Sequence, residues 1–343
     1  MFGRSAKPIR VQVFGKTDVG RSREHNEDRF LVADLTRKDA SLQPQVRQHD
    51  LGERGSLFVV ADGMGGAAAG ELASQMATDT IFAHLLKAWN AETEATPQRF
   101  AHRLKEAVEV ANANIHAHAK AHPEVRGMGT TTTAAGVLGE HLYLTQVGDS
   151  RAYLVRGGVA HQLTKDQSLM QRLVEAGELT EEEAAHSERR NIILQALGPD
   201  PKVKVDLTHQ DVRRGDVLVL CSDGLSGQVK KEEIAQIVTS ASDLAAACDK
   251  LIALANERGG PDNITVVMAR FDGEGLRSTG QQEEIGHQIY PLIDTETSTE
   301  PVPIYKGSRA PVPTKDARPR PLTVVLGALA VLAAVLWYFT RSR

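Results

Sequence analysis

Apolar runs of strand length recur along the chain as far as Asp272, and acidic residues repeatedly stand where such a run begins or ends. They are Glu27 and Asp28 in HNEDRFLV, Asp62 in VVADGMGG, Asp149 in LTQVGDSRAY, Asp223 in LVLCSDGLS and Asp262 in GGPDNITVV. Carboxylates that meet without a counter-charge repel one another and raise each other's pKa values. If these strand ends lie together in the fold, the acidic residues need cations among them.

Taken singly, each of these segments also fits an ordinary turn. Asp-Gly, Gly-Asp-Ser and Pro-Asp-Asn are common in turns, because glycine accepts positive φ and aspartate bonds to its own backbone. As a set they favour a metal site of oxygen ligands, which is typical of Mg²⁺ or Mn²⁺ and not of Zn²⁺. Gly63 then has a second use, since its carbonyl can approach the same ion. The two cysteines, Cys221 and Cys248, are too few for a cysteine-rich zinc site.

The order of the predicted elements favours antiparallel sheets with helices packed outside. Two long amphipathic helices, from about Ala67 to Lys87 and from Pro97 past Ile115, follow the third predicted strand, and several strands then come in close succession. This order departs from the strict strand–helix alternation of a parallel doubly wound sheet. The predicted strands are Val11–Phe14, Phe30–Ala33, Leu57–Ala61, Thr130–Val137, Leu142–Val147, Ala152–Val155, Val203–Leu207, Val217–Cys221 and Ile264–Phe271. A polar insertion is expected at 36–55, and shorter helices after the caps Ser168 and Thr180 and at 235–238 and 244–255.

A cationic group that could bind a phosphoryl substrate lies beside the first acidic pair. Arg21 and Arg23 occur in GRSREHNED, just before Glu27 and Asp28. An arginine in a loop is most often a solvated surface residue. Next to a metal-facing Asn-Glu-Asp, however, its planar guanidinium can bind a phosphate through two parallel hydrogen bonds.

Six segments taken together identify a family resemblance. They are TDVGRSREHNEDRF, VVADGMGG, GMGTTTTAAGV, VGDSRAYL, LCSDGLS and GGPDNITVV, in this order. From Gln12 to Asp272 the chain resembles the bacterial branch of the metal-dependent protein phosphatases (type 2C, PPM). The resemblance implies an α+β fold, a four-layer αββα sandwich of two antiparallel β-sheets flanked by helices. It also implies hydrolysis of phosphoserine and phosphothreonine by a water that bridges two divalent ions, Mn²⁺ or Mg²⁺, with a third, weaker ion nearby.

The resemblance assigns metal ligands residue by residue. Asp62 is expected to bridge both core ions, with the Gly63 carbonyl on one of them and Asp223 and Asp262 on the other. Asp149 resembles the ligand of the third ion, which it would share with Asp223.

The remaining roles concern the loop before the second predicted strand. Glu27 and Asp28 are expected to act on the metals mostly through water. Arg23, rather than Arg21, matches the phosphate-binding arginine of the family. Asn263 follows a metal aspartate and is expected to orient it. The expected catalytic residues are Arg23, Asp62 and Asp223.

Two positions depart from the family pattern. Met64 stands where eukaryotic members have a histidine proposed as general acid, and a thioether cannot donate a proton. His25 is near in sequence, but a histidine in such a loop is more often structural or solvated. Residues 165–198 resemble the bacterial flap subdomain beside the substrate groove. There Gln167 replaces a frequent histidine, which we expect to affect substrate choice rather than chemistry.

The sequence after the catalytic region changes character. Residues 10–272 are predicted to form the catalytic domain, and 273–321 a disordered Pro-rich linker, since half of the 14 prolines lie between Pro291 and Pro321. Residues 322–340 contain the uncharged run LTVVLGALAVLAAVLWYF, which is long enough to span a bilayer. More basic residues precede this run than follow it, which predicts a single-pass inner-membrane protein with a cytoplasmic catalytic domain. A buried C-terminal helix is the alternative.

The expected partners follow from the same interpretation. They are phosphorylated proteins, a cognate Ser/Thr kinase and its substrates, and the membrane through the C-terminal helix. A net charge of −4 gives no general attraction to nucleic acid, so no nucleic-acid partner is expected. Two alternatives remain: an inactive scaffold that binds phosphoproteins, and an enzyme dedicated to one regulatory protein. The presence of Asp62, Asp223 and Asp262 argues against the inactive scaffold.

Overall fold

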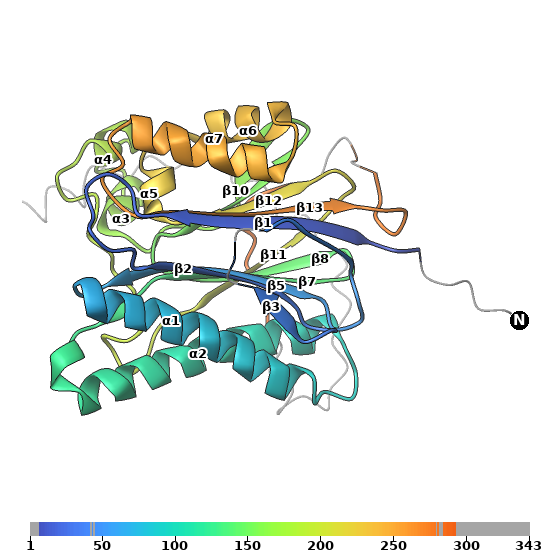
Figure 1. Cartoon of the computed structure of the whole chain (residues 1–343), viewed down its shortest axis with the longest axis horizontal. Helices are drawn as coiled ribbons and strands as arrows, with labels where there is room; N and C mark the ends of the chain where they lie inside the picture. Colours follow the sequence, from blue (N-terminus) through green and yellow to red (C-terminus); the bar gives the residue numbers. More distant parts are fainter. Residues whose placement is uncertain (1–6, 42, 44, 279, 281–283, 293–343) are drawn as a thin grey trace, which may run out of the picture. The chain divides into compact units, whose positions relative to one another are not determined.

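A computed structural model of the chain describes residues 7–41, 43, 45–278, 280 and 284–292. These residues form one compact unit. Two antiparallel β-sheets lie face to face in it, and helices cover the outer side of each sheet (Figure 1). The prediction of an α+β fold with two antiparallel sheets flanked by helices is therefore confirmed.

Each sheet draws its strands from both halves of the chain. One contains β1 (Arg10–Asp18), β4 (Arg47–Asp50), β9 (Arg151–Arg156), β10 (Val159–Gln162), β12 (Val217–Cys221) and β13 (Ile264–Asp272), in the order β10-β9-β12-β13-β1-β4. The other contains β2 (Asp28–Asp34), β3 (Asp39–Ser41), β5 (Ser56–Met64), β6 (Gly129–Thr130), β7 (Thr132–Leu138), β8 (His141–Val147) and β11 (Asp206–Asp211). Its order is β11-β8-β7-β5-β2-β3, and β6 pairs with β5.

The helices form the two outer layers. On the second sheet lie α1 (Ala67–His84), which continues as a π-helical turn η1 (Leu85–Trp89), and α2 (Pro97–Ala121) (Figure 1). On the first sheet lie α6 (Lys231–Ser240) and α7 (Leu244–Glu257). The shorter helices are the 3₁₀ turn η2 (Pro123–Val125), α3 (Leu169–Glu175), α4 (Glu181–Ala185) and α5 (Asp223–Ser226).

Strand β5 shows why the sequence forms four layers. Its apolar residues are buried on both faces, which explains the unbroken apolar run in the sequence. Leu57 and Val59 pack in the core beneath the helices α1 and α2. Phe58 and Val60, which alternate with them, pack in the core between the two sheets. A strand with two apolar faces has to lie between two layers, and β5 is such a strand up to Ala61.

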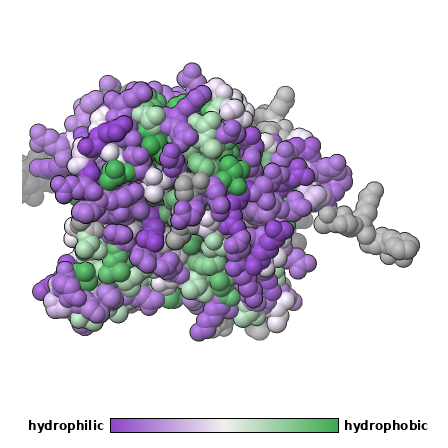
Figure 2. Space-filling view, in the orientation of Figure 1, coloured by the Kyte–Doolittle hydropathy of each residue, from purple (hydrophilic) through white to green (hydrophobic). Residues whose placement is uncertain are grey.

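The start of α2 follows the predicted capping pattern. The Thr96 hydroxyl accepts a hydrogen bond from the Arg99 N–H, and Pro97 occupies the first turn. Phe100 and Leu104 are buried against β7, where Gly136 leaves room, since a Cβ at that position would lie 2.7 Å from the Phe100 ring. Apolar side chains are thereby drawn inside, and the face shown in Figure 2 is mostly hydrophilic with separate hydrophobic patches.

Several element boundaries differ from the sequence-based predictions. The insertion at 36–55 contains the short strands β3 and β4, and β10 was not predicted. Strand β5 does not stop at Ala61 but runs through Asp62 to Met64, and the strand expected at Val203–Leu207 lies at Asp206–Asp211. These segments have few apolar residues, so hydrogen bonding to neighbouring strands, rather than local pattern, makes them strands.

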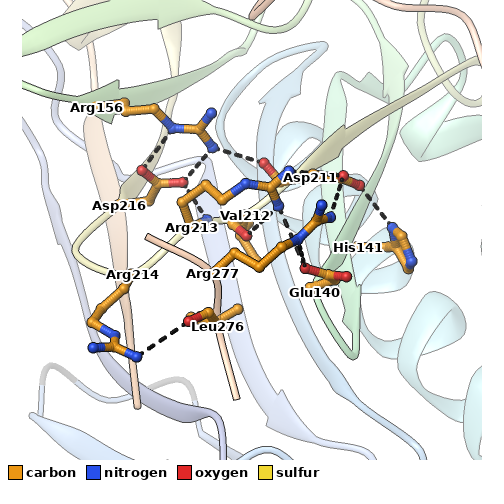
Figure 3. Close-up of polar contacts among 10 residues, drawn as sticks. All are labelled: Glu140, His141, Arg156, Asp211, Val212, Arg213, Arg214, Asp216, Leu276 and Arg277. Carbon is orange, nitrogen blue, oxygen red and sulfur yellow. Dashed lines mark hydrogen bonds and ion pairs between the residues drawn. The ribbon is translucent and has the colours of Figure 1, made fainter. Parts of the chain in front are cut away.

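A network of ion pairs joins the two sheets at the end of β9 and β11 (Figure 3). Arg156, at the end of β9, binds both carboxylate oxygens of Asp216 at 2.9 and 2.7 Å. Its guanidinium also donates to the Asp211 carbonyl at the end of β11. The Arg156 and Asp216 side chains are only 4% and 1% exposed. Breaking such a buried pair leaves an uncompensated charge, so the network strongly constrains how the sheets meet here.

The packed unit extends beyond β13. We name residues 273–278, 280 and 284–292 the C-terminal strap. Arg277 donates to Glu140 at 2.8 Å in the turn between β7 and β8 (Figure 3). Farther on, the Tyr290 N–H donates to the Leu207 carbonyl of β11, and the Tyr290 ring packs edge-on against Tyr143. The first part of the segment expected to be a tether, as far as residue 292, thus lies on the catalytic unit.

The remaining C-terminal predictions fall outside the described residues. This holds for the rest of the predicted linker, 293–321, and for the predicted membrane segment, 322–340. Among the described residues, no helix combines the length and the apolar character needed to cross a bilayer.

Candidate metal centre and active site

The strand ends that carry acidic residues meet at one edge of the two sheets. Asp28 and Asp62 lie opposite each other in the pair β2–β5 of one sheet. Asp223 follows β12 and Asp262 precedes β13, two neighbouring antiparallel strands of the other sheet. Asp149 lies in the short connection from β8 to β9, which passes from one sheet to the other.

These residues surround an open cavity of about 480 Å³. Of the predicted site residues, the cavity is lined by Arg23, Glu27, Asp62, Gly63, Asp149, Asp223 and Asp262. Asp28 is not part of the lining and is nearly fully buried. Arg21 does not line the cavity either; its backbone N–H donates to the Gly260 carbonyl. Met64, His25 and Asn263 do line it.

Two carboxylate oxygens in this group are buried and lack a hydrogen-bond donor. They are Oδ1 of Asp28 and Oδ1 of Asp223. The other oxygen of Asp28 accepts a hydrogen bond from the Ser222 hydroxyl at 2.7 Å. Buried polar atoms nearly always have a partner, so orphaned anionic oxygens point to a cation. The donor set consists of oxygens, as Mn²⁺ and Mg²⁺ prefer.

The electrostatics of the acidic residues also fit a site for divalent cations. Burial first, and then the neighbouring aspartates Asp28 and Asp223, raise the pKa of Asp62 well above its usual range. Burial and the Asp223 charge raise the pKa of Asp149 to about 7. Burial raises the pKa of Asp28 to about 7, against the opposing effect of its Ser222 hydrogen bond. Divalent cations would offset this concentration of negative charge.

Some of these carboxylates are bound to protein groups. Asp262 accepts a hydrogen bond from the Arg23 guanidinium at 2.8 Å, and this contact raises the pKa of Arg23. Among the described residues, no three acidic, histidine or cysteine side chains converge closely enough to enclose an ion as they stand. The Arg23–Asp262 pair places the expected phosphate ligand directly beside an expected metal ligand.

Gly63 is required by close packing. A Cβ at this position would lie 2.2 Å from the Gly70 carbonyl oxygen and 2.6 Å from that of Glu27. A Cβ at Gly70 would in turn lie 2.6 Å from the Glu27 carboxylate. Both glycines therefore let the first turns of α1 approach β5 and residue 27. Gly70 was not singled out from the sequence, although its place just after VVADGMGG was a usable signal.

The threonines of GMGTTTTAAGV hold the backbone of Asp62, a role that sequence analysis missed. The Thr130 hydroxyl and the Thr131 N–H both donate to the Asp62 carbonyl at 2.8 Å. The Asp62 N–H donates to the Thr131 hydroxyl, which also contacts the Ser150 hydroxyl at 2.8 Å. The segment thus connects Asp62 to the residue that follows Asp149.

Asn263 contacts Asp262 through its backbone, since its N–H donates to Oδ1 of Asp262 at 2.9 Å, while its side chain bonds elsewhere. Its side-chain oxygen accepts from the Glu27 N–H at 2.8 Å, and its side-chain nitrogen donates to the carbonyls of Val19 and His25. Asn263 therefore fixes the loop that carries Arg23 and Glu27. The flap supplies two further lining residues that were not predicted, Asn191 and Ile193.

Comparison with known proteins agrees with this geometry. Residues 32–263 match the family model described as protein phosphatase 2C. The chain belongs to the protein phosphatase 2C family. It is a metal-dependent protein serine/threonine phosphatase that acts on phosphorylated proteins, as the sequence predicted, and its cofactor is Mn²⁺ or Mg²⁺.

Individual relatives cover nearly the whole of the described unit. The serine/threonine phosphatase Stp of Listeria monocytogenes is 38% identical over 258 residues, which is 75% of this chain and 94% of that protein. The Streptococcus agalactiae serine/threonine phosphatase has a TM-score of 0.66 at 34% identity, covering 76% of this chain and 99% of that one. The catalytic domain of the phosphatase PstP, in complex with two manganese ions, has a TM-score of 0.61 at 36% identity, with 77% and 99% covered.

Proposed function

We propose that this phosphatase hydrolyses phosphoserine and phosphothreonine at the cavity at one edge of the two sheets. The observation that carries the proposal is the convergence of acidic strand ends from both sheets on one cavity that also holds an arginine. Asp62, the Gly63 carbonyl, Asp223 and Asp262 would hold two core ions. Asp149 would hold a third with Asp223, and Glu27 and Asp28 would contribute through water. Ions bound there would supply a water of lowered pKa and charge compensation for the phosphoryl oxygens.

Arg23 binds and orients the substrate phosphate in this proposal. Its guanidinium is half exposed and lies at the cavity wall, within 2.8 Å of Asp262. A guanidinium can donate two parallel hydrogen bonds to phosphate oxygens, which lysine cannot reproduce. Because Arg23 contacts an expected metal ligand, phosphate bound by Arg23 would lie next to the ions.

Protonation of the leaving serine or threonine oxygen does not involve Met64. Its side chain lines the cavity but has no proton to donate. His25 also lines the cavity; it is exposed, and its carbonyl is held by Asn263. We propose that the His25 imidazole is not the general acid, so His25→Asn is expected to lower kcat by less than the roughly 100-fold typical of a lost general acid.

A C-terminal tether places this activity at a membrane in our proposal. Residues 10–272 would be the catalytic domain and 165–198 its flap, with 322–340 as a single transmembrane helix in the inner membrane. The basic residues before the helix favour a cytoplasmic catalytic domain. The substrates would include a cognate Ser/Thr kinase and its targets. Carbonate extraction of membranes containing the full chain tests the anchor: release into the soluble fraction would contradict it.

The catalytic proposal is tested with p-nitrophenyl phosphate and a phosphothreonine peptide, with and without Mn²⁺. We expect activity to require Mn²⁺ and to disappear with EDTA. Arg23→Lys keeps the charge, so it is expected to raise KM for the peptide and to lower kcat/KM by about 10-fold or more, owing to loss of bidentate binding. Activity that survives EDTA, or an Arg23→Lys variant with unchanged kcat/KM, would contradict these assignments.

A further inference from the structure

Gln167, at the beginning of the flap, forms two hydrogen bonds with Gly148, the residue before Asp149. The Gly148 N–H donates to the Gln167 side-chain oxygen at 3.0 Å. The Gln167 N–H donates to the Gly148 carbonyl at 2.9 Å. Gln167 thus bonds to both backbone polar groups of Gly148, in the connection that carries Asp149 between the two sheets; the Gly148 carbonyl also accepts from the Gln146 side-chain nitrogen at 3.1 Å.

The nitrogen of the same side-chain amide is anchored at the start of β11 and just before it. This nitrogen donates to Oδ2 of Asp206 at 3.0 Å and to the Lys204 carbonyl at 3.3 Å. Only one orientation of the amide fits these partners, because its oxygen must accept from an N–H and its nitrogen must donate to oxygens. A glutamate here would lose the donor and face the Asp206 carboxylate. An amide is therefore suited to this position for a physical reason.

Gly148 has a backbone conformation that needs such support. Its φ of +101° lies in the region that favours glycine, and a Cβ there would lie 2.6 Å from Cγ2 of Thr131. Thr131 therefore packs against Gly148 on one side, while Gln167 bonds to it on the other. With both contacts in place, the direction in which Asp149 leaves the backbone is constrained.

The same residue holds the flap. The Leu194 N–H donates to the Gln167 carbonyl at 2.7 Å, and the adjacent Ser168 forms an isolated β-bridge with Ile193. Ile193 lines the cavity. One short segment therefore connects the flap, β11 and the Asp149 connection.

From these contacts we infer that Gln167 is a positioning residue: it orients Asp149 for cation binding and couples that orientation to the flap. The sequence had led us to expect an effect of Gln167 on substrate choice. Gln167 does not line the cavity, so its effect on the site runs through Gly148 and Asp149. This inference rests on the proposed role of Asp149 as a metal ligand.

The experiment compares Gln167→Met with Gln171→Met in the full chain. Methionine keeps the length of the side chain and removes its hydrogen bonds. Gln171 is a matched control because it also lies in the flap, on α3, and its side chain bonds only to Glu175 among the contacts observed. Mn²⁺ binding is measured by calorimetry for both variants, for Asp149→Ala and for the double variant Asp149→Ala/Gln167→Met. Hydrogen exchange of the Gly148 amide is followed in parallel by NMR.

We expect Gln167→Met to weaken by about 10-fold or more the Mn²⁺ site that Asp149→Ala removes, as is usual when a group that orients a ligand is lost. In the Asp149→Ala background the same substitution is expected to change nothing further. Exchange of the Gly148 amide is expected to accelerate in Gln167→Met and not in Gln171→Met. Gln167→Asn, whose shorter amide cannot reach both partners, is expected to behave like Gln167→Met and replaces it if that variant does not fold.

Three results would overturn the inference. The inference fails if Gln167→Met binds Mn²⁺ as tightly as Gln171→Met does, even if the Gly148 amide exchanges faster. An additional loss of affinity in the double variant would show that Gln167 does not act through Asp149. If the wild-type chain binds Mn²⁺ but Asp149→Ala binds it equally, the proposed ligand role of Asp149 fails and the inference fails with it. Wild-type protein that binds no Mn²⁺ would contradict the proposed function as a whole.

Discussion

Asp28 and Asp62 lie directly opposite each other across the antiparallel strands β2 and β5. Facing residues on neighbouring strands are close, and like charges in such a pair destabilise a sheet. Here Asp28 is buried and has an oxygen without a donor, and Asp62 is partly buried at the cavity. The pair is therefore unfavourable for the fold by itself and favourable for holding a divalent cation.

Asp62→Asn is expected to have opposite effects on activity and on stability. Turnover with Mn²⁺ is expected to fall by at least about 100-fold, because the change removes a proposed metal ligand. In EDTA the free energy of unfolding is expected to rise by about 1 kcal/mol or more, because one of the repelling charges is gone. Phosphatase assays and urea denaturation measure the two effects. Asp79→Asn, on the exposed face of α1, is the control and is expected to change neither.

Asp216→Asn tests the network of ion pairs at the far end of β9. The change leaves Arg156 buried beside a neutral partner, so we expect a loss of about 3–5 kcal/mol in the free energy of unfolding. Glu274→Gln breaks the exposed pair with Lys7 and is expected to cost less than about 1 kcal/mol. Chemical denaturation measures the free energy of unfolding of both variants. Equal values would show that the buried network contributes no more to stability than a surface ion pair.

Tyr290→Ala tests whether the C-terminal strap contributes to the catalytic unit. The ring packs against Tyr143 and His209, and its hydroxyl donates to the Gln98 side chain at 3.0 Å. Loss of the ring is expected to cost about 1.5–3 kcal/mol. Tyr290→Phe, which keeps the ring, is expected to cost about 0.5–1.5 kcal/mol. If the alanine variant unfolds at the same temperature as the wild type, the strap is not part of the folded unit.

Glu233 gives a pH dependence that is independent of the metal site. Its hydrogen bond with Arg258 lowers the pKa of Glu233 to about 2. A carboxyl whose pKa is lower in the folded state stabilises the protein above its unfolded pKa, near 4.3, and loses this effect as the pH falls toward 2. We expect the stability difference between wild type and Glu233→Gln to be constant above pH ~5 and to shrink between there and pH ~2. A difference that does not vary over this range would contradict the assignment.

The sequence predicted the type of fold, and most of the predicted site residues line one cavity, for identifiable reasons. Long apolar runs such as Val217–Cys221 are strands in any context that buries both faces, and the caps at Thr96 and Thr180 act locally. The acidic residues could be recognised because they interrupt apolar runs at regular places. The strands β3 and β4 could not, since their polar sequences become strands only by pairing with β2 and β1.

The supporting contacts of the residues around the site could not be predicted from the sequence, for a related reason. Thr130, Thr131 and Gln167 are ordinary polar residues, and each is distant in sequence from the backbone that it holds. Asn263 illustrates the limit: its position next to Asp262 indicated the contact that its N–H makes with that carboxylate, but not the hydrogen bond between its side chain and the Glu27 N–H. Hydrogen bonds of this kind depend on where the strands end in space, and the local sequence pattern does not give this information.

By itself, the sequence determined the chemistry that this protein can perform. Oxygen ligands at strand ends, an arginine beside them and two cysteines in all restrict the site to hard divalent cations and an anionic substrate. Tertiary structure alone decided which oxygens are left without donors, that Arg23 forms an ion pair with Asp262, and that Gln167 bonds to Gly148, the residue before Asp149. The physical reason is that residue types set charge and ligand preference, whereas burial, distance and hydrogen-bond partners arise only when two sheets and a flap are brought together.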